Sequence, residues 1–114
     1  MPYIETKVSV AISKEKEQRM KERLGQAISL IPGKSEQWLM LRFEDNCRMY
    51  FGGTNDAPSA FVEVRILHDS TREAYESMTK AIMAILSEEL AIDPARVYIK
   101  YSPGDDWGWN GGNF

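Results

Sequence analysis

The feature that most constrains the fold of this chain is an internal repeat. Two halves are predicted to share one order of elements: strand 3–10, helix 14–31, strand 37–43, and then strand 60–67, helix 71–90, strand 96–101. The stretches SEQWLMLRFE and DPARVYIKYS take equivalent places in the two halves. Strand–helix–strand units favour parallel pairing of their two strands. The repeat therefore predicts an α+β fold, with two β-α-β units forming a four-stranded sheet and both helices on one face.

Local patterns support these elements. Alternate residues of the first strand share one apolar face, beginning at Ile4. Ser13 is a good N-cap for the first helix, and Pro32-Gly33 ends it. Ser70 and Glu73 fit a capping box at the start of the second helix. Between the halves, residues 49–51 are predicted to form a short extra strand.

The length of 114 residues indicates one domain spanning 1–114. A sheet with both helices on one face leaves its other face bare. A partner subunit is the simplest cover for such a short chain, so we expect an oligomer. The C-terminal stretch PGDDWGWNGGNF has no regular period, but it carries too much aromatic surface for a loose end. We expect it to dock on a pocket wall or on a neighbouring subunit.

Composition excludes several classes of function. The net charge of −3 gives no general attraction to nucleic acid, and no apolar run approaches a membrane span. With one cysteine, Cys47, and one histidine, His68, neither an internal disulfide nor a zinc site is expected. The start of the chain lacks the layout of a signal peptide. We expect a cytoplasmic protein, with secretion by a route that needs no signal peptide as the alternative.

The first two residues, Met1-Pro2, allow two interpretations. Proline is tolerated at the first position of a strand, so the pair can be an ordinary start. If Met1 is removed, however, Pro2 becomes a free secondary amine, which is a base. An ordinary α-amino group has a pKa of about 7.7–8.0, and burial or a nearby cation lowers that pKa toward neutrality. Such an amine can both accept and return a proton at neutral pH.

Five motifs decide between these interpretations when taken together: MP at the first strand, GK after the first helix, FGG after the second strand, DPARVYIKY after the second helix, and WGWNGGNF at the end. In this order they resemble the macrophage migration inhibitory factor family of the tautomerase superfamily. The resemblance implies a homotrimer with an active site at each subunit interface. It implies a phenylpyruvate tautomerase-type isomerase, which acts on small aromatic α-keto acids without cofactor or metal. The alternative it carries is a cytokine-type signalling protein that binds a protein receptor.

The resemblance also assigns roles to residues. Pro2 becomes the general base and acid, and Lys34 binds the substrate carboxylate while lowering the pKa of the proline. The backbone N–H of Leu67 contacts substrate, although the register can slip by one to Ile66. Tyr98 enters from the adjacent subunit. The pocket wall and mouth are assigned to Tyr3, Trp38, Arg65, Trp109 and Phe114.

The chain departs from the family pattern at two places. Lys100 stands where mammalian members have an asparagine that holds the far end of the substrate. This lysine can favour a substrate with an electron-rich or anionic far end, weaken binding of an ordinary aromatic keto acid, or extend its ammonium into solvent. The chain also lacks the CxxC pair of some members, so no thiol–disulfide activity is expected.

Overall fold

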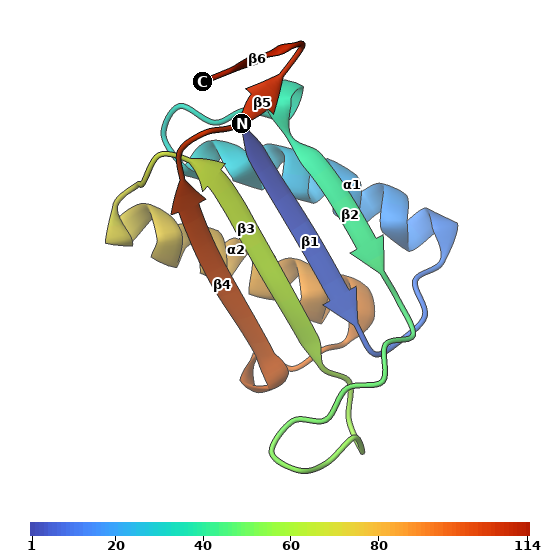
Figure 1. Cartoon of the computed structure of the whole chain (residues 1–114). Coiled ribbons are helices and arrows are strands. Elements are labelled where there is room, and N and C mark those ends of the chain that lie inside the picture. Colours follow the sequence, from blue (N-terminus) through green and yellow to red (C-terminus); the bar gives the residue numbers. More distant parts are fainter.

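The computed structural model describes residues 1–114, and its four long strands form one sheet in the order β2-β1-β3-β4 (Figure 1). The strands are β1 (Pro2–Val8), β2 (Met40–Glu44), β3 (Ala60–Leu67) and β4 (Val97–Gly104). β1 pairs with β2 in parallel, and β3 pairs with β4 in parallel. The two halves then meet through antiparallel pairing of β1 with β3. The predicted repeat is confirmed, and it places the starts of β1 and β2 beside the end of β3.

The helices follow the predicted positions with small differences. α1 (Lys14–Ala27) begins after Ser13, whose hydroxyl accepts a hydrogen bond from the Lys16 N–H. It ends earlier than predicted and continues as a 3₁₀ turn, Ile28–Leu30. α2 (Arg72–Leu90) is capped by Thr71, whose hydroxyl accepts from the Ala74 N–H. The predicted cap at Ser70 is wrong, because the Ser70 N–H is bound by Asp69 and the Tyr75 hydroxyl in the turn before the helix.

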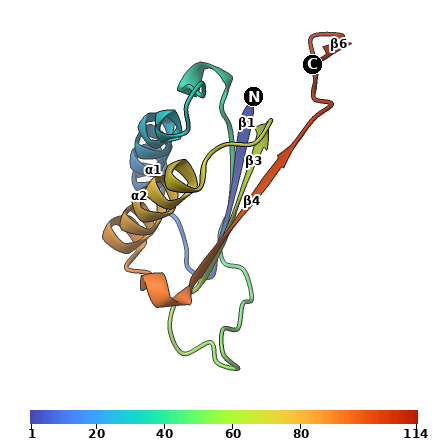
Figure 2. The ribbon, with the colours of Figure 1, turned by 90° about the vertical axis from the view of Figure 1, so that its left-hand side faces the viewer.

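The core lies between the two helices and one face of the sheet (Figure 2). Alternate residues of β1 and β3 are buried there, including Ile4, Val64 and Ile66, each with no exposed surface. Met20 of α1 and Met78 of α2 are buried against them. Because side chains alternate along a strand, this burial sends the intervening residues to the other face.

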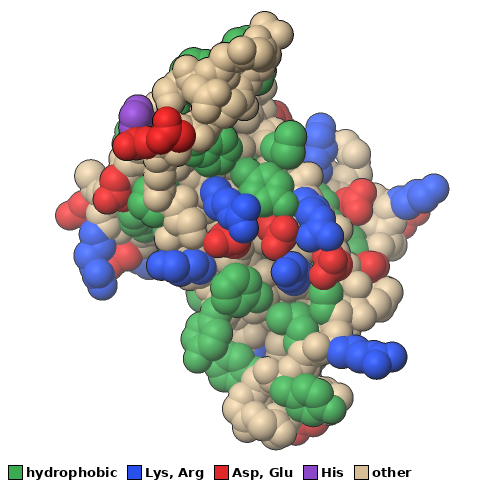
Figure 3. Space-filling view, viewed as in Figure 1, with side chains coloured by type: hydrophobic (Ala, Val, Ile, Leu, Met, Phe, Trp, Pro, Cys, Tyr) green, Lys and Arg blue, Asp and Glu red, His purple; other side chains and the backbone are tan.

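The other face of the sheet is open and carries charged side chains across its strands (Figure 3). Arg42 of β2 pairs with Glu5 of β1 at 3.1 Å, and Arg65 pairs with Glu63 within β3 at 2.7 Å. Large apolar groups remain exposed as well: in the single chain, Tyr98 is 63% exposed. The bare face predicted from the repeat is therefore present, and it mixes ion pairs with uncovered aromatic surface.

The two irregular stretches differ from the predictions in detail. The expected strand at 49–51 is reduced to a single bridge between Phe51 and Thr54. The C-terminal stretch, predicted to have no regular structure, forms a hairpin of β5 (Gly108–Trp109) and β6 (Gly112–Asn113). Asn110 and Gly111 both have positive φ, as a tight two-residue hairpin turn requires. None of the helices is both long enough and apolar enough to cross a bilayer.

Candidate active site

A cavity of about 530 Å³ opens where β1 begins. This volume is within the range of small-molecule sites, about 300–1,000 Å³. Four parts of the chain build the cavity: the start of β1, the stretch from the 3₁₀ turn Glu36–Trp38 into β2, the end of β3, and the C-terminal hairpin with Trp107 before it. Its lining residues are Met1, Pro2, Tyr3, Gln37, Trp38, Leu39, Met40, Arg65, Trp107, Gly108 and Trp109. Pro2, Tyr3, Trp38, Arg65 and Trp109, all predicted from the sequence, thus lie around one hollow.

Lys34 reaches the same end of the sheet from the loop after α1. Gly33 has a φ of +82°, a conformation that glycine adopts without steric cost, and it turns the chain so that the Lys34 N–H donates to the Ile31 carbonyl. The Lys34 ammonium then donates to the Leu67 carbonyl oxygen at 2.8 Å. Burial lowers the pKa of this lysine below its ordinary value. A partly desolvated cation is therefore held beside the end of β3.

The amino terminus lies within the electrostatic reach of this lysine. Burial, and secondarily the positive charge of Lys34, lower the pKa of the terminal amine, here on Met1. The Met1 carbonyl oxygen accepts a hydrogen bond from the Leu67 N–H at 3.1 Å. The Leu67 N–H, which the family resemblance assigns to substrate, therefore points toward the amino terminus. In the chain that keeps Met1, this N–H already donates to the Met1 carbonyl oxygen.

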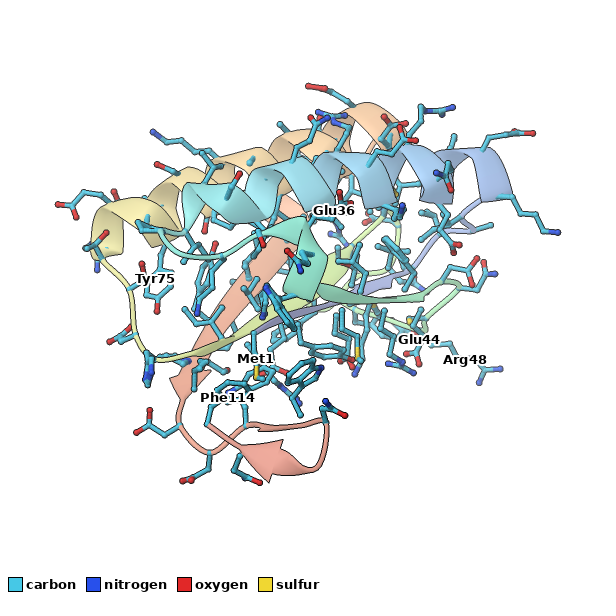
Figure 4. The ribbon with its side chains drawn as sticks, turned by 90° about the horizontal axis from the view of Figure 1, so that it is seen from above. Met1, Glu36, Glu44, Arg48, Tyr75 and Phe114 are labelled. Carbon is cyan, nitrogen blue, oxygen red and sulfur yellow. The ribbon has the colours of Figure 1, made fainter.

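Aromatic rings form the wall of the cavity. The rings of Trp38 and Trp109 meet edge to face with their centroids 5.1 Å apart. Phe114 is not among the lining residues, but its ring centroid lies 6.2 Å from that of Trp109 and its N–H donates to the Trp107 carbonyl at 2.8 Å. Figure 4 shows Met1 and Phe114 at the same end of the molecule. The hairpin brings Trp109 into the cavity lining, as predicted for a pocket wall, but Trp109 and Phe114 stay 49% and 59% exposed in the single chain. Docking of the tail on a neighbouring subunit stays a prediction.

These features agree with comparisons to known proteins. A family model described as macrophage migration inhibitory factor (MIF) matches residues 1–114. The chain belongs to the MIF family. It is 31% identical over 93 residues to the macrophage migration inhibitory factor of Mus musculus, and this match covers 80% of each chain. The crystal structure of Leishmania major MIF2 superposes with a TM-score of 0.92 at 32% identity, covering 100% of this chain and 97% of that one.

A more distant likeness extends the fold comparison beyond proteins named MIF. Pt0534, crystallised after inactivation by 2-oxo-3-pentynoate, has a TM-score of 0.82 at 18% identity. The match covers 97% of this chain and 94% of Pt0534. At this identity the likeness shows a shared fold. This MIF-family chain therefore shares its α+β fold with a protein that is not named MIF.

Two of the predicted MIF site residues lie elsewhere in the single chain. Tyr98 and Lys100 are in the first half of β4, whereas β4 reaches the level of Pro2 only at Pro103, through Ile66. Tyr98 instead packs on Phe51, with the ring centroids 5.0 Å apart. One subunit alone does not bring these two residues to its own cavity.

The sequence reasoning missed several lining residues. Gln37, Leu39 and Met40 flank the predicted Trp38, and a prediction for the whole loop would have included them. Trp107 was visible in the WGW motif, but the position of its backbone depends on the hairpin. No sequence signal placed the Met1 carbonyl on the Leu67 N–H.

A second hollow, of about 620 Å³, lies away from the amino terminus and contains Cys47 among its lining residues. Burial, followed by the hydrogen bond to Glu44, raises the pKa of this thiol and so keeps it protonated. A protonated thiol is a poor nucleophile. No group of three His, Cys, Asp or Glu side chains is arranged to hold a metal ion. The cavity at the start of β1 is therefore the better candidate for chemistry.

Proposed function

We propose that this MIF-family chain is a cofactor-free keto–enol tautomerase of aromatic α-keto acids such as phenylpyruvate. Pro2 acts as general base and acid once the chain begins with its free secondary amine. The observation that carries the proposal is the convergence of Pro2, an aromatic wall and Lys34 at one end of the sheet. Tautomerisation needs these three components: a base, a hydrophobic slot and a cation for the carboxylate.

The electrostatics of this end of the sheet favour such a base. The lowered pKa of the terminal amine increases the fraction that is neutral near pH 7. A Pro2 amine would lie at the first residue of β1, in the lining of the same cavity. The structural neighbour inactivated by 2-oxo-3-pentynoate is consistent with this class of ligand, because that compound is itself a 2-oxo acid.

The proposed reaction moves one proton and no electrons. In ketonisation the neutral Pro2 amine accepts the proton of the enol hydroxyl as the carbonyl forms. The resulting ammonium delivers a proton to the adjacent carbon, and the amine is neutral again. Lys34 binds the carboxylate, and the Leu67 N–H donates to an oxygen of the substrate. Trp38 and Trp109 hold the ring and exclude water.

We further propose that the enzyme is a homotrimer in which Tyr98 and Lys100 of one subunit reach the cavity of the next. The open face of the sheet supports this arrangement, since it leaves Phe61 39% exposed and Tyr98 63% exposed. Light scattering should give a mass three times the chain mass of 13.0 kDa. A monomeric mass at micromolar concentration would contradict the assembly.

The test of the proposed function is an ultraviolet assay of phenylpyruvate ketonisation, performed on protein whose intact mass proves that it begins at Pro2. Turnover is expected for the wild type, with a loss of about 10²- to 10⁴-fold in Pro2→Gly, the range of general acid–base catalysis. Unchanged turnover in Pro2→Gly would remove the proline from the reaction.

The second candidate is receptor signalling, which is favoured by the 31% identity to a mouse protein named as a migration inhibitory factor. The Pro2→Gly variant separates the two functions. Signalling that persists in a variant without turnover is independent of catalysis, whereas signalling lost together with turnover depends on the intact site.

A further inference from the structure

The cavity at the start of β1 has one charged side chain in its lining, Arg65. The other lining residues are apolar or aromatic apart from Gln37, and no carboxylate is among them. The Arg65 side chain is 52% exposed, so its guanidinium remains accessible. A cation in a hydrophobic slot without an acidic neighbour in the lining favours an anionic ligand group.

Neighbouring side chains fix the orientation of this guanidinium. Its Nε and Nη2 atoms both donate to Oε1 of Glu63, at 3.1 and 2.7 Å. The other oxygen of Glu63 accepts from the Ser102 hydroxyl at 3.0 Å. The guanidinium carbon also lies 5.7 Å from the centroid of the Tyr3 ring. Glu63 and Tyr3 thus hold Arg65 at the edge of the cavity.

This arrangement leaves three of the five guanidinium N–H donors free. A guanidinium presents two forked edges, one formed by Nε with an Nη atom and the other by the two Nη atoms. Glu63 occupies the first edge of Arg65, and no protein acceptor binds Nη1. An Nη–Nη edge matches the two oxygens of a carboxylate.

The open face as a whole carries one more cation than carboxylates, with Glu63 as the direct partner of Arg65. The open face of the sheet carries four cations, Lys7, Arg42, Arg65 and Lys100, and three carboxylates, Glu5, Glu44 and Glu63. Figure 3 shows the blue and red groups interspersed across these strands. The matched comparison is Arg42, which lies on the same face but uses both of its Nη atoms on Glu5 and Glu44.

We infer that Arg65 is a specificity-determining residue, and that it selects aromatic α-keto acids with a second acidic group on or near the ring. The inference rests on the proposed function for the identity of the reacting end, which Lys34 holds. Arg65 then receives the second carboxylate on its free edge while the ring lies against the tryptophans. An uncharged ring leaves that edge to water.

The test uses two ligands that lack the keto group and cannot react: phenylpropanoate and its para-carboxylated analogue. Their binding to Met-free protein is followed by tryptophan fluorescence. The wild type is expected to bind the dicarboxylate about tenfold more tightly, the effect of one exposed charge-assisted pair. Arg65→Gln should bind the two ligands with equal affinity, because the second carboxylate then has no free guanidinium edge to bind. Arg42→Gln should keep the preference, and unchanged melting temperatures exclude misfolding.

Kinetics give an independent readout. The ratio of kcat/KM for a carboxylated arylpyruvate to that for phenylpyruvate should fall about tenfold in Arg65→Gln. Equal binding of both ligands by the wild type, a preference that survives Arg65→Gln, or no binding of either ligand would overturn the inference. If the protein turns over no keto acid but still prefers the dicarboxylate through Arg65, the proposed reaction fails and the binding site stands. If it turns over phenylpyruvate without preferring the dicarboxylate, the inference about Arg65 fails and the proposed reaction stands.

Discussion

Retention of Met1 should inactivate this protein for two separable reasons. The first is chemical, because a peptide-bonded proline nitrogen has no basic lone pair. The second is steric, because the Met1 carbonyl occupies the Leu67 N–H at 3.1 Å, the donor proposed for substrate. The perturbation is a comparison of two forms, one that keeps Met1 and one that begins at Pro2, each verified by intact mass.

Each effect has its own expected magnitude. Loss of the general base is expected to cost about 10²- to 10⁴-fold in turnover. Loss of one hydrogen bond to a charged ligand costs about 1.5–3 kcal/mol, which is about 10- to 150-fold in affinity. The retained form should therefore show both a lower kcat and weaker binding of an unreactive aromatic acid. Its kcat/KM should be at least about 10³-fold below that of the form beginning at Pro2.

The assay pairs phenylpyruvate ketonisation with fluorescence binding of phenylpropanoate. The Pro2→Gly variant, processed so that its Met1 is removed, is the matched control. It leaves the Leu67 N–H free, so it should keep affinity. It replaces the rigid secondary amine of proline with a flexible primary amine, so it should lose most of the turnover. Equal turnover by the two wild-type forms would refute the role of the amine. Equal affinity in the two forms would refute the role of the Leu67 donor and leave the base untouched.

Three further predictions concern the surroundings of the site and of the sheet. Lys34→Ala should raise KM for phenylpyruvate about 10- to 150-fold, with a smaller change in kcat. Because Lys34 lowers the pKa of the terminal amine, its removal should also shift the acid limb of the kcat/KM profile to higher pH, while Lys14→Ala changes neither quantity. Trp38→Ala removes one side of the edge-to-face pair, so it should weaken phenylpropanoate binding about 2- to 12-fold, and Tyr50→Ala, in a distant exposed loop, should not. The hydrogen bond from Tyr3 holds the pKa of Glu5 below its ordinary value of 4.5, so its stabilisation is present above about pH 4.5 and is lost as the pH falls through the lower folded pKa. The melting temperature of Glu5→Gln should therefore fall less steeply than that of the wild type as the pH is lowered. Parallel curves of melting temperature against pH would contradict this role of Glu5.

The core of the fold could be predicted from the sequence because burial leaves a periodic record. Alternation in β3 and the helical spacing of apolar residues such as Met78 and Ile82 fixed both the elements and their inward faces. The boundaries were less predictable. Thr71 replaced Ser70 as a cap because the Ser70 N–H is held by Asp69 and Tyr75, a local contact that the pattern S-T-R-E does not encode.

The candidate site was predictable only in part. Family motifs identified Pro2, Lys34 and Trp109, but a motif gives residue types and no distances. The free edge of Arg65 depends on Glu63, two residues away on the same strand, and on Ser102 of the neighbouring strand. The structure of one subunit does not place Tyr98 and Lys100 at the cavity, because they lie in the part of β4 that is away from Pro2.

The order of polar and apolar residues along the chain determined that two β-α-β units would form one sheet with one bare face. The spacing of the apolar residues shows which face of each strand and helix is buried. Tertiary structure alone decided which groups meet where β1 begins. A loop after α1, the end of β3 and a C-terminal hairpin come together there through packing between segments distant in the chain. The spacing of residues along the chain does not show how close these distant segments lie in the fold.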